Sequence, residues 1–289
     1  MAWSERKLTR RFGVELAGAR IDRDLPRAAR TAVYDAVIER GLVLIPGQSL
    51  SDDDVHAFAG TLGEVLPSTP FSDLPQGKLL AITNLNARGE LRPAGDWYVR
   101  AMKGNELWHV DLSFMRPRAT LSILYGKVVT PVGGNTEFCD LRLACEAFSA
   151  EERSHLATLT AWHDIFHSRR SLGFDELNAE ELGKHPPVPR PLLSRHESGR
   201  DTLLLASHIC QLSGHDCAES AAMLRELTAR ATVPENVYSH KWRAGDLLLW
   251  DNRCVMHRAT PFDDTADPRD LRAVRLCDLA DLPEALAPV

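Results

Sequence analysis

Residues 105–114 read Asn-Glu-Leu-Trp-His-Val-Asp-Leu-Ser-Phe. If this stretch is extended, the two-residue period of a strand places the side chains of His109 and Asp111 on the same face. An imidazole beside a carboxylate supplies two of the three ligands of a 2-His-1-carboxylate facial triad, the usual non-haem Fe(II) site. The alternative is an ordinary surface pair in which His109 donates a hydrogen bond to Asp111, because a His-x-Asp sequence often arises by chance.

A candidate for the third ligand comes much later in the chain. Residues 247–257 read Leu-Leu-Leu-Trp-Asp-Asn-Arg-Cys-Val-Met-His. The apolar run predicts a buried strand, and the polar residues after it predict a turn. Such a strand could carry His257 to the mouth of a barrel. His109, Asp111 and His257 are therefore a candidate metal site with positions left open for other ligands.

The rest of the chain shows short strand patterns at both ends and helical patterns between them. Capping residues or helical spacing predict helices over Arg27–Arg40, from Ser51 to about Gly63, over 149–159 and over Glu219–Arg230. Apolar runs predict an edge ribbon at 12–22 and strands at 42–45, 78–84, 120–129, 237–242, 246–250 and 271–276. This order favours a mainly β fold with inserted helices (α+β), a sandwich or barrel, over alternating βαβ units.

Composition excludes several classes of protein. The net charge of −6 argues against a nucleic-acid surface, and the longest apolar stretches are too short to cross a membrane. The six cysteines form no Cys-x-x-Cys pair, which argues against zinc-ribbon and thioredoxin-like sites. No phosphate-binding glycine loop and no Gly-x-Ser-x-Gly hydrolase motif is present. We expect a cytoplasmic protein with reduced thiols.

Three motifs follow one another along the chain: Trp108-His-x-Asp-x-x-Phe114, Gly133-Gly-Asn-Thr-Glu-Phe138 and Trp250-Asp-Asn-Arg-x-x-x-His257-Arg258. In kind, order and distance they resemble the taurine/2,4-dichlorophenoxyacetate dioxygenase family, and the phenoxyacetate-type branch is the most similar in these motifs. The resemblance runs from about residue 10 to 276. It implies a double-stranded β-helix (jelly-roll) core in a single domain, 1–289, with a helical insert at about 140–230.

The resemblance also implies a cofactor set and a site. Fe(II) would be held by His109, Asp111 and His257, with 2-oxoglutarate as co-substrate and O₂ as oxidant. Arg269 would grip the distal carboxylate of 2-oxoglutarate, because its planar fork gives two charge-assisted hydrogen bonds. Thr136 would offer a hydroxyl to the same carboxylate. The alternatives are a solvated strand-edge arginine and a strand threonine that is already hydrogen-bonded. A small-molecule substrate and a homo-oligomer are implied as well.

Substrate contacts are less clearly implied. Asn105 matches a family position on the substrate side, although it would equally suit a turn. His163, His167 and His208 could each face the cavity, but a hydrogen-bonded structural role is the expectation for each of them.

The sequence departs from the family where the substrate's anion is bound. Relatives have a second arginine four residues after the 2-oxoglutarate arginine, and this chain has Ala273 there. Arg272 has the wrong strand parity, whereas Arg275 has the parity of Arg269. Three alternatives remain. The chain has no cation for the substrate's anion, Arg275 takes the place of the family arginine, or a loop-like lid at 85–106, which carries Lys103, Arg100 and other cations, supplies one.

These observations leave three functional hypotheses. The first is an Fe(II)/2-oxoglutarate dioxygenase that hydroxylates a small carboxylate, aryloxyalkanoate-like, and releases succinate and CO₂. The second keeps this chemistry for a sulfonate, a sulfate ester, or a biosynthetic hydroxylation or desaturation. The third is a non-catalytic jelly-roll binding protein, against which the intact set of His109, Asp111 and His257 argues.

Overall fold

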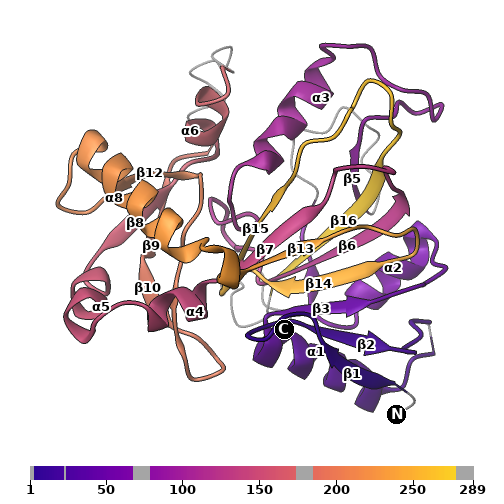
Figure 1. Ribbon diagram of the computed structural model, residues 1–289, viewed down its shortest axis with the longest axis horizontal. Coiled ribbons are helices and arrows are strands. Elements are labelled where there is room, and N and C mark those ends of the chain that lie inside the picture. Colours follow the sequence, from indigo (N-terminus) through magenta and orange to yellow (C-terminus); the bar gives the residue numbers. More distant parts are fainter. Residues whose placement is uncertain (1–2, 23, 68–78, 174–184, 278–289) are drawn as a thin grey trace, which may run out of the picture.

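The computed structural model describes residues 3–22, 24–67, 79–173 and 185–277. Half of the strands belong to one large sheet, in which all pairs but one are antiparallel (Figure 1). Its order is β1 (Ser4–Lys7), β2 (Val14–Ala17), β3 (Leu42–Ile45), β14 (Leu247–Asp251), β6 (Leu121–Val128), β16 (Asp270–Cys277) and β4 (Glu64–Val65), and β5 (Leu80–Thr83) also pairs with β16.

A smaller sheet provides the frame of the site. It has the order β13 (Val237–His240), β7 (Thr136–Asp140), β15 (Val255–Ala259). Beyond β15, His109 adds an isolated antiparallel bridge to His257. The chain reaches β15 directly from β14, so the predicted strand-and-turn run does deliver His257 from the large sheet into the small one.

The core explains why β3 and β14 are continuously apolar. Alternate residues Val43, Ile45, Leu247 and Leu249 pack in one cluster with Val33 and Val37 of α1 (Arg27–Arg40). The residues between them, Leu42, Leu44, Leu248 and Trp250, pack in another cluster with Phe138 and Val255 of the small sheet. Both faces of the large sheet are covered there, so neither face of these strands can be polar.

Helix ends follow capping chemistry. Gly41 closes α1 with a positive φ of 76°, and its N–H donates to the Val37 carbonyl. Ser51 and Asp54 form the capping box of α2 (Asp52–Ala59). The helix ends at Ala59, so the prediction that it runs to about Gly63 is wrong. Gly63 lies against the backbone of β16, where a side chain would come within 2.9 Å of the Cys277 carbonyl. The chain turns there to pair β4 with β16.

The 140–230 segment is more than helical. It contains α4 (Leu141–Glu146), α5 (Ala150–Leu156), α6 (Ile165–Arg170) and α8 (Cys217–Ala231), and also β8 (Thr160–His163), β9 (Val188–Pro191), β10 (Leu193–Arg195), β11 (Asp201–Leu203) and β12 (Ile209–Leu212). These elements lie to one side of the large sheet (Figure 1). Met256 and Cys139 of the small sheet pack into their core. The small sheet is thus sandwiched between this segment and the large sheet.

Of the edge ribbon predicted at 12–22, Val14–Ala17 forms a strand (β2), and it lies between β1 and β3 and not at the edge of the sheet. The other predicted strands match to within about two residues at either end, apart from Lys78, which lies outside the described residues. The predicted 85–106 lid is not purely loop-like, because it contains α3 (Trp97–Met102) and the 3₁₀ helix η1 (Lys103–Glu106). Asp96 caps α3 by accepting from the Tyr98 and Val99 N–H groups. Within the described residues, no helix has the length and apolar character needed to cross a bilayer.

Candidate metal centre

His109, Asp111 and His257 come together as predicted. His109 Nε2 lies 3.9 Å from Asp111 Oδ1, and His257 Nε2 lies 4.0 Å from Asp111 Oδ2. One ligand atom from each residue falls within 4.8 Å of the others, and all three side chains are buried. Two imidazoles and one carboxylate at this spacing fit a facial triad for Fe(II), with the remaining coordination positions open toward the cavity.

The geometry differs from the expected extended strand. Only His109 is bridged, and Asp111 begins a turn in which Leu112 has a φ of 49°. A buried leucine in the left-handed region is strained. This strained residue directly follows the Asp111 ligand and borders a cavity that adjoins the site.

The two imidazoles are prepared for a metal. Nδ1 of His109 lies 2.7 Å from the Leu107 carbonyl, which can only accept, so Nε2 keeps its lone pair. Nδ1 of His257 is buried and has no partner among the described residues. Burial lowers the pKa of His109, and burial with the nearby His109 lowers that of His257 to about 3. Both rings are therefore neutral at pH 7, as metal binding requires.

Asp111 is held by a network that the sequence analysis missed. Ser122 Oγ donates to Asp111 Oδ2 at 2.6 Å, and Asn252 Nδ2 donates to Ser122 Oγ at 2.8 Å. Asn252 Oδ1 accepts from the Asp111 N–H and from Trp250 Nε1, each at 3.0 Å. Burial alone would raise the pKa of Asp111, but the Arg275 charge, the two imidazoles and the Ser122 hydrogen bond together outweigh it and keep that pKa below its usual range.

The predicted 2-oxoglutarate residues border the same cavity as the three ligands. Arg269 is buried, its Nη2 donates to the Gly134 carbonyl at 3.2 Å, and it has no acidic partner among the described residues. Burial lowers its pKa to about 10, so it remains charged at pH 7. Trp242 Nε1 donates to Thr136 Oγ1 at 3.0 Å, which leaves the Thr136 hydroxyl proton free to donate. The site therefore presents a desolvated cation and a donor with no anion between them.

Strand β16 has the predicted parity. Arg269, Leu271, Ala273 and Arg275 all border the cavity, whereas Arg272 points elsewhere and pairs with Asp270 at 2.9 Å.

The three residues expected to contact substrate differ in which cavity they border and in whether they are paired with an acid. Asn105 borders the metal cavity and a second one beside it. Arg275 also borders both, but its Nε lies 3.4 Å from Asp111 Oδ2. Lys103 borders the first cavity and is paired with Asp264 at 2.7 Å and Glu106 at 3.3 Å.

Of His163, His167 and His208, it is His208 that borders a cavity at the site. Ring centroids of His208 and His109 are 5.9 Å apart, and His208 borders the second cavity together with Arg169. His163 Nδ1 is bonded to Ser113 Oγ at 2.9 Å, and burial lowers its pKa to about 3. His167 is exposed. His208 is thus a cavity residue as well as a hydrogen-bonded one, and Arg169 is a cavity residue that sequence patterns did not single out.

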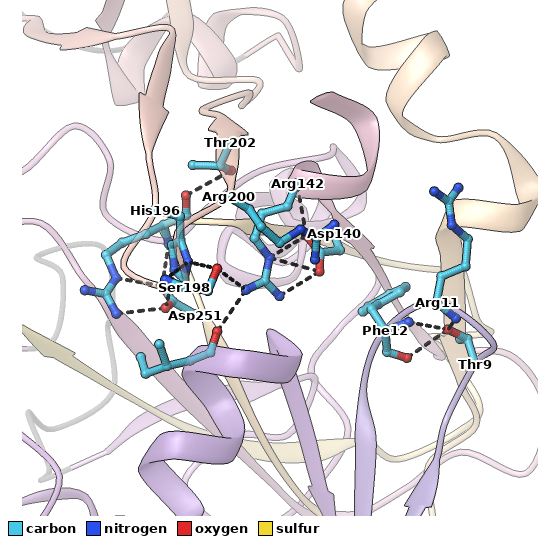
Figure 2. A network of polar contacts seen from close by, with 12 residues as sticks. Thr9, Arg11, Phe12, Asp140, Arg142, His196, Ser198, Arg200, Thr202 and Asp251 are labelled. Carbon is cyan, nitrogen blue, oxygen red and sulfur yellow. Dashed lines mark hydrogen bonds and ion pairs between the residues drawn. The ribbon is translucent and has the colours of Figure 1, made fainter. Parts of the chain in front are cut away.

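A second cluster with metal-ligand residue types, His196, Asp251 and Cys254, was also not anticipated. Its carboxylate, Asp251, already has hydrogen-bonding partners within the protein, among them His196 (Figure 2). His196 Nε2 lies 3.0 Å from Asp251 Oδ2, and the Arg253 guanidinium donates to both oxygens of Asp251. Burial raises the pKa of the Cys254 thiol, which opposes its binding to a metal as thiolate. This network joins the inserted segment to β14 and serves structure.

Comparison with known proteins agrees with this geometry. Residues 4–275 match the family described as "Taurine catabolism dioxygenase TauD, TfdA family". The chain is 37% identical over 247 residues to the alpha-ketoglutarate-dependent 2,4-dichlorophenoxyacetate dioxygenase of Burkholderia sp. (strain RASC), covering 83% of this chain and 82% of that protein. It is 34% identical over 263 residues to the (S)-phenoxypropionate/alpha-ketoglutarate-dioxygenase of Sphingobium herbicidovorans, covering 88% of each. The crystal structure of AAD-2 in complex with Mn(II) and N-oxalylglycine superposes with a TM-score of 0.88 at 33% identity, covering 96% of this chain and 98% of that one.

Proposed function

Since this chain belongs to the TauD/TfdA family and is a 2-oxoglutarate-dependent dioxygenase, we propose that it hydroxylates a small aryloxyalkanoate-like carboxylate. The observation that carries the reaction class is the buried His109–Asp111–His257 set facing an arginine without an acidic partner among the described residues. With Fe(II), 2-oxoglutarate and O₂ bound, the centre oxidises substrate while 2-oxoglutarate becomes succinate and CO₂.

The chain's own residues position these reactants. His109, Asp111 and His257 would hold Fe(II), and the Ser122–Asn252 network orients the carboxylate among them. Arg269 would bind the distal carboxylate of 2-oxoglutarate through its guanidinium, and Thr136 would donate its hydroxyl proton to it. Trp250 and Phe138 pack against His257, with ring centroids 4.6 and 6.0 Å away, and keep water from that side of the site.

Substrate would enter the space bordered by Asn105. Lys103 and Arg275 border the same space, and each forms an ion pair with an acidic residue. Lys103 would therefore shape the entrance, and Arg275 would hold Asp111 in place. The 85–106 segment supplies this wall through α3 and η1, which suits it to act as a lid.

The wider expectations remain proposals of the same kind. Two facing antiparallel sheets with a metal site between them support a double-stranded β-helix core in a single domain. All six cysteines are free, which supports a reducing, cytoplasmic setting. A homo-oligomer follows from family resemblance, and light scattering of the purified protein tests it.

The function is tested by a substrate panel. Purified enzyme with Fe(II), ascorbate and 2-oxoglutarate is offered phenoxyacetate, phenoxypropionate, an alkyl sulfate, taurine and a neutral aryl ether, and succinate is measured. We expect succinate release that depends on the aryloxyalkanoates. Stimulation by the sulfate ester or taurine alone would assign the second hypothesis instead, and no 2-oxoglutarate turnover with any of them would favour a binding protein.

A further inference from the structure

A second cavity meets the metal site at His109 and Asp111. Thr136 and Arg269 border only the first cavity, whereas Arg169 and His208 border only the second. The two spaces thus share two of the three proposed metal ligands but not the cation of the 2-oxoglutarate subsite. Because 2-oxoglutarate would take the side of Arg269, the second cavity remains for the molecule that is oxidised.

Arg169 is the cation that borders the second cavity and not the first. It lies in α6, partly buried, and its guanidinium rests against the backbone of Gly104. A Cβ atom at Gly104 would lie only 1.5 Å from Arg169 Nη1 and 2.8 Å from Cζ. Because Gly104 has no side chain, the Arg169 guanidinium can occupy this space.

The charge of Arg169 has no partner in the described part of the chain. Its guanidinium makes no hydrogen bond or ion pair there, and burial lowers its pKa with no carboxylate offsetting the effect. Arg275 and Lys103, the other cations at these cavities, are each paired with acids. Desolvating a cation is costly unless an anion compensates for it. Arg169 is therefore to the second cavity what Arg269 is to the first, a cation available for a ligand's anion.

The neighbours of Arg169 suit an aromatic acid. Leu80, Ile82, Met102, Phe114 and Ile165 give the cavity apolar walls. Ser168 Oγ donates to the Ile165 carbonyl and so accepts from His208 Nδ1, which leaves His208 Nε2 as an acceptor in the neutral ring. His208 therefore cannot donate to a carboxylate. Arg275 also borders this cavity but pairs with Asp111, so Arg169 is the cation here that has no acidic partner in the described part of the chain.

We propose that Arg169 binds the substrate's carboxylate while the aryl group packs against Phe114 and the apolar walls. Arg169 would thus replace the family arginine, whose position is occupied by Ala273 in this chain. This inference rests on the proposed function and names its anion anchor. Each charge-assisted hydrogen bond contributes enough that losing one is expected to weaken binding at least about tenfold.

Calorimetry without O₂ tests the anchor directly. Protein loaded with Fe(II) and 2-oxoglutarate is titrated with phenoxyacetate and with neutral 2-phenoxyethanol. In Arg169→Gln we expect the Kd for phenoxyacetate to rise about tenfold or more and that for phenoxyethanol to stay within about twofold, with Arg169→Lys intermediate. Arg170→Gln, which removes the adjacent exposed cation, is the control and should match wild type.

Gly104→Ala supplies a second variant that keeps every charge. Its backbone conformation tolerates alanine, but the new methyl group must displace the Arg169 guanidinium. We expect a rise in the KM for phenoxyacetate with the KM for 2-oxoglutarate unchanged, and thermal melting checks that each variant is folded.

The outcomes separate this inference from the proposed function. If wild type oxidises phenoxyacetate and Arg169→Gln binds it equally well, the anchor is wrong and the function stands. If Arg275→Gln alone abolishes the preference for the acid over phenoxyethanol, Arg275 is the anchor. If wild type neither binds nor oxidises aryloxyalkanoates but still consumes 2-oxoglutarate, the substrate class and the anchor both fall.

Discussion

His109 and His257 are cross-strand partners. Each backbone N–H donates to the other's carbonyl, at N···O distances of 3.0 and 2.8 Å, and the ring centroids lie 4.2 Å apart. Because directly opposed residues of an antiparallel pair project side chains to the same face, one backbone register sets two of the three proposed ligands. A slip of one residue would turn one imidazole away, so the site is organised by the sheet before a metal binds.

Removing any one ligand should therefore abolish iron binding without unfolding the protein. For His109→Ala, Asp111→Ala and His257→Ala we expect loss of turnover and at least about a hundredfold weaker Fe(II) affinity, because a facial triad has no spare protein ligand. Anaerobic Fe(II) titration and thermal melting measure the two properties. His155→Ala, at an exposed site on α5, is the control, and near-normal activity in two of the three variants would refute the site.

The Ser122 hydroxyl should increase the affinity for Fe(II) without being a ligand. Ser122→Ala removes the hydrogen bond to Asp111 and leaves Asn252 Nδ2 without its acceptor. Loss of such a partner costs about 10–100-fold in metal affinity, and we expect that range for Fe(II). Ser154→Ala removes a hydroxyl of an exposed helix residue and serves as the matched control. Equal Fe(II) affinity in the two variants would show that Asp111 needs no such support.

Arg269 and Arg272 should respond differently to the same change. Arg269→Lys keeps the charge but loses the fork, so the KM for 2-oxoglutarate should rise about tenfold or more while that for substrate changes less. Arg272→Lys should change neither, because Arg272 points away from the cavity and pairs with Asp270. Steady-state kinetics with 2-oxoglutarate varied measures both. If Arg272→Lys alone raises this KM, the assignment of faces on β16 is wrong.

Local patterns predicted four of the helices and the central strands of the large sheet, whereas the ligand set also needed the resemblance of three motifs to a known family. The two-residue period correctly separated Arg269 and Arg275 from Arg272, and the capping boxes at Ser51 and Ser149 correctly began two helices. These features depend on neighbours in sequence, where propensity and alternation act directly.

What the sequence concealed depends on distant contacts. The strands β8 to β12 of the inserted segment are only three or four residues long, too short for a clear period. Arg169 and the exposed Arg170 are adjacent in the sequence. Only the tertiary structure, in which Arg169 packs closely against Gly104, distinguishes the first arginine from the second. Asp111 and Ser122 likewise meet through tertiary packing, since Asn252 joins them from the other end of the chain.

The buried network around Asp251 should stabilise the fold at neutral pH. Although burial alone would raise the pKa of this carboxyl, His196 and Arg253 lower it to about 2. An unfolded Asp titrates near about 3.9, so the contribution is present above pH 4 and is lost as pH falls toward 2. A depression of this size corresponds to about 2–3 kcal/mol.

Asp251→Asn should therefore reduce the free energy of unfolding at pH 7 by about 2–3 kcal/mol, because it removes the buried carboxylate from Arg253, which keeps only its ion pair with the exposed Glu197. Part of the acid sensitivity between pH 4 and 2 should disappear with it. Asp201→Asn breaks the exposed Arg195–Asp201 pair and should cost at most about 1 kcal/mol. Urea unfolding of wild type and both variants at pH 7 and pH 3 measures this. Equal losses for the two variants at pH 7 would show that the network contributes no more than a surface ion pair, and that the inserted segment is held to β14 by apolar packing alone.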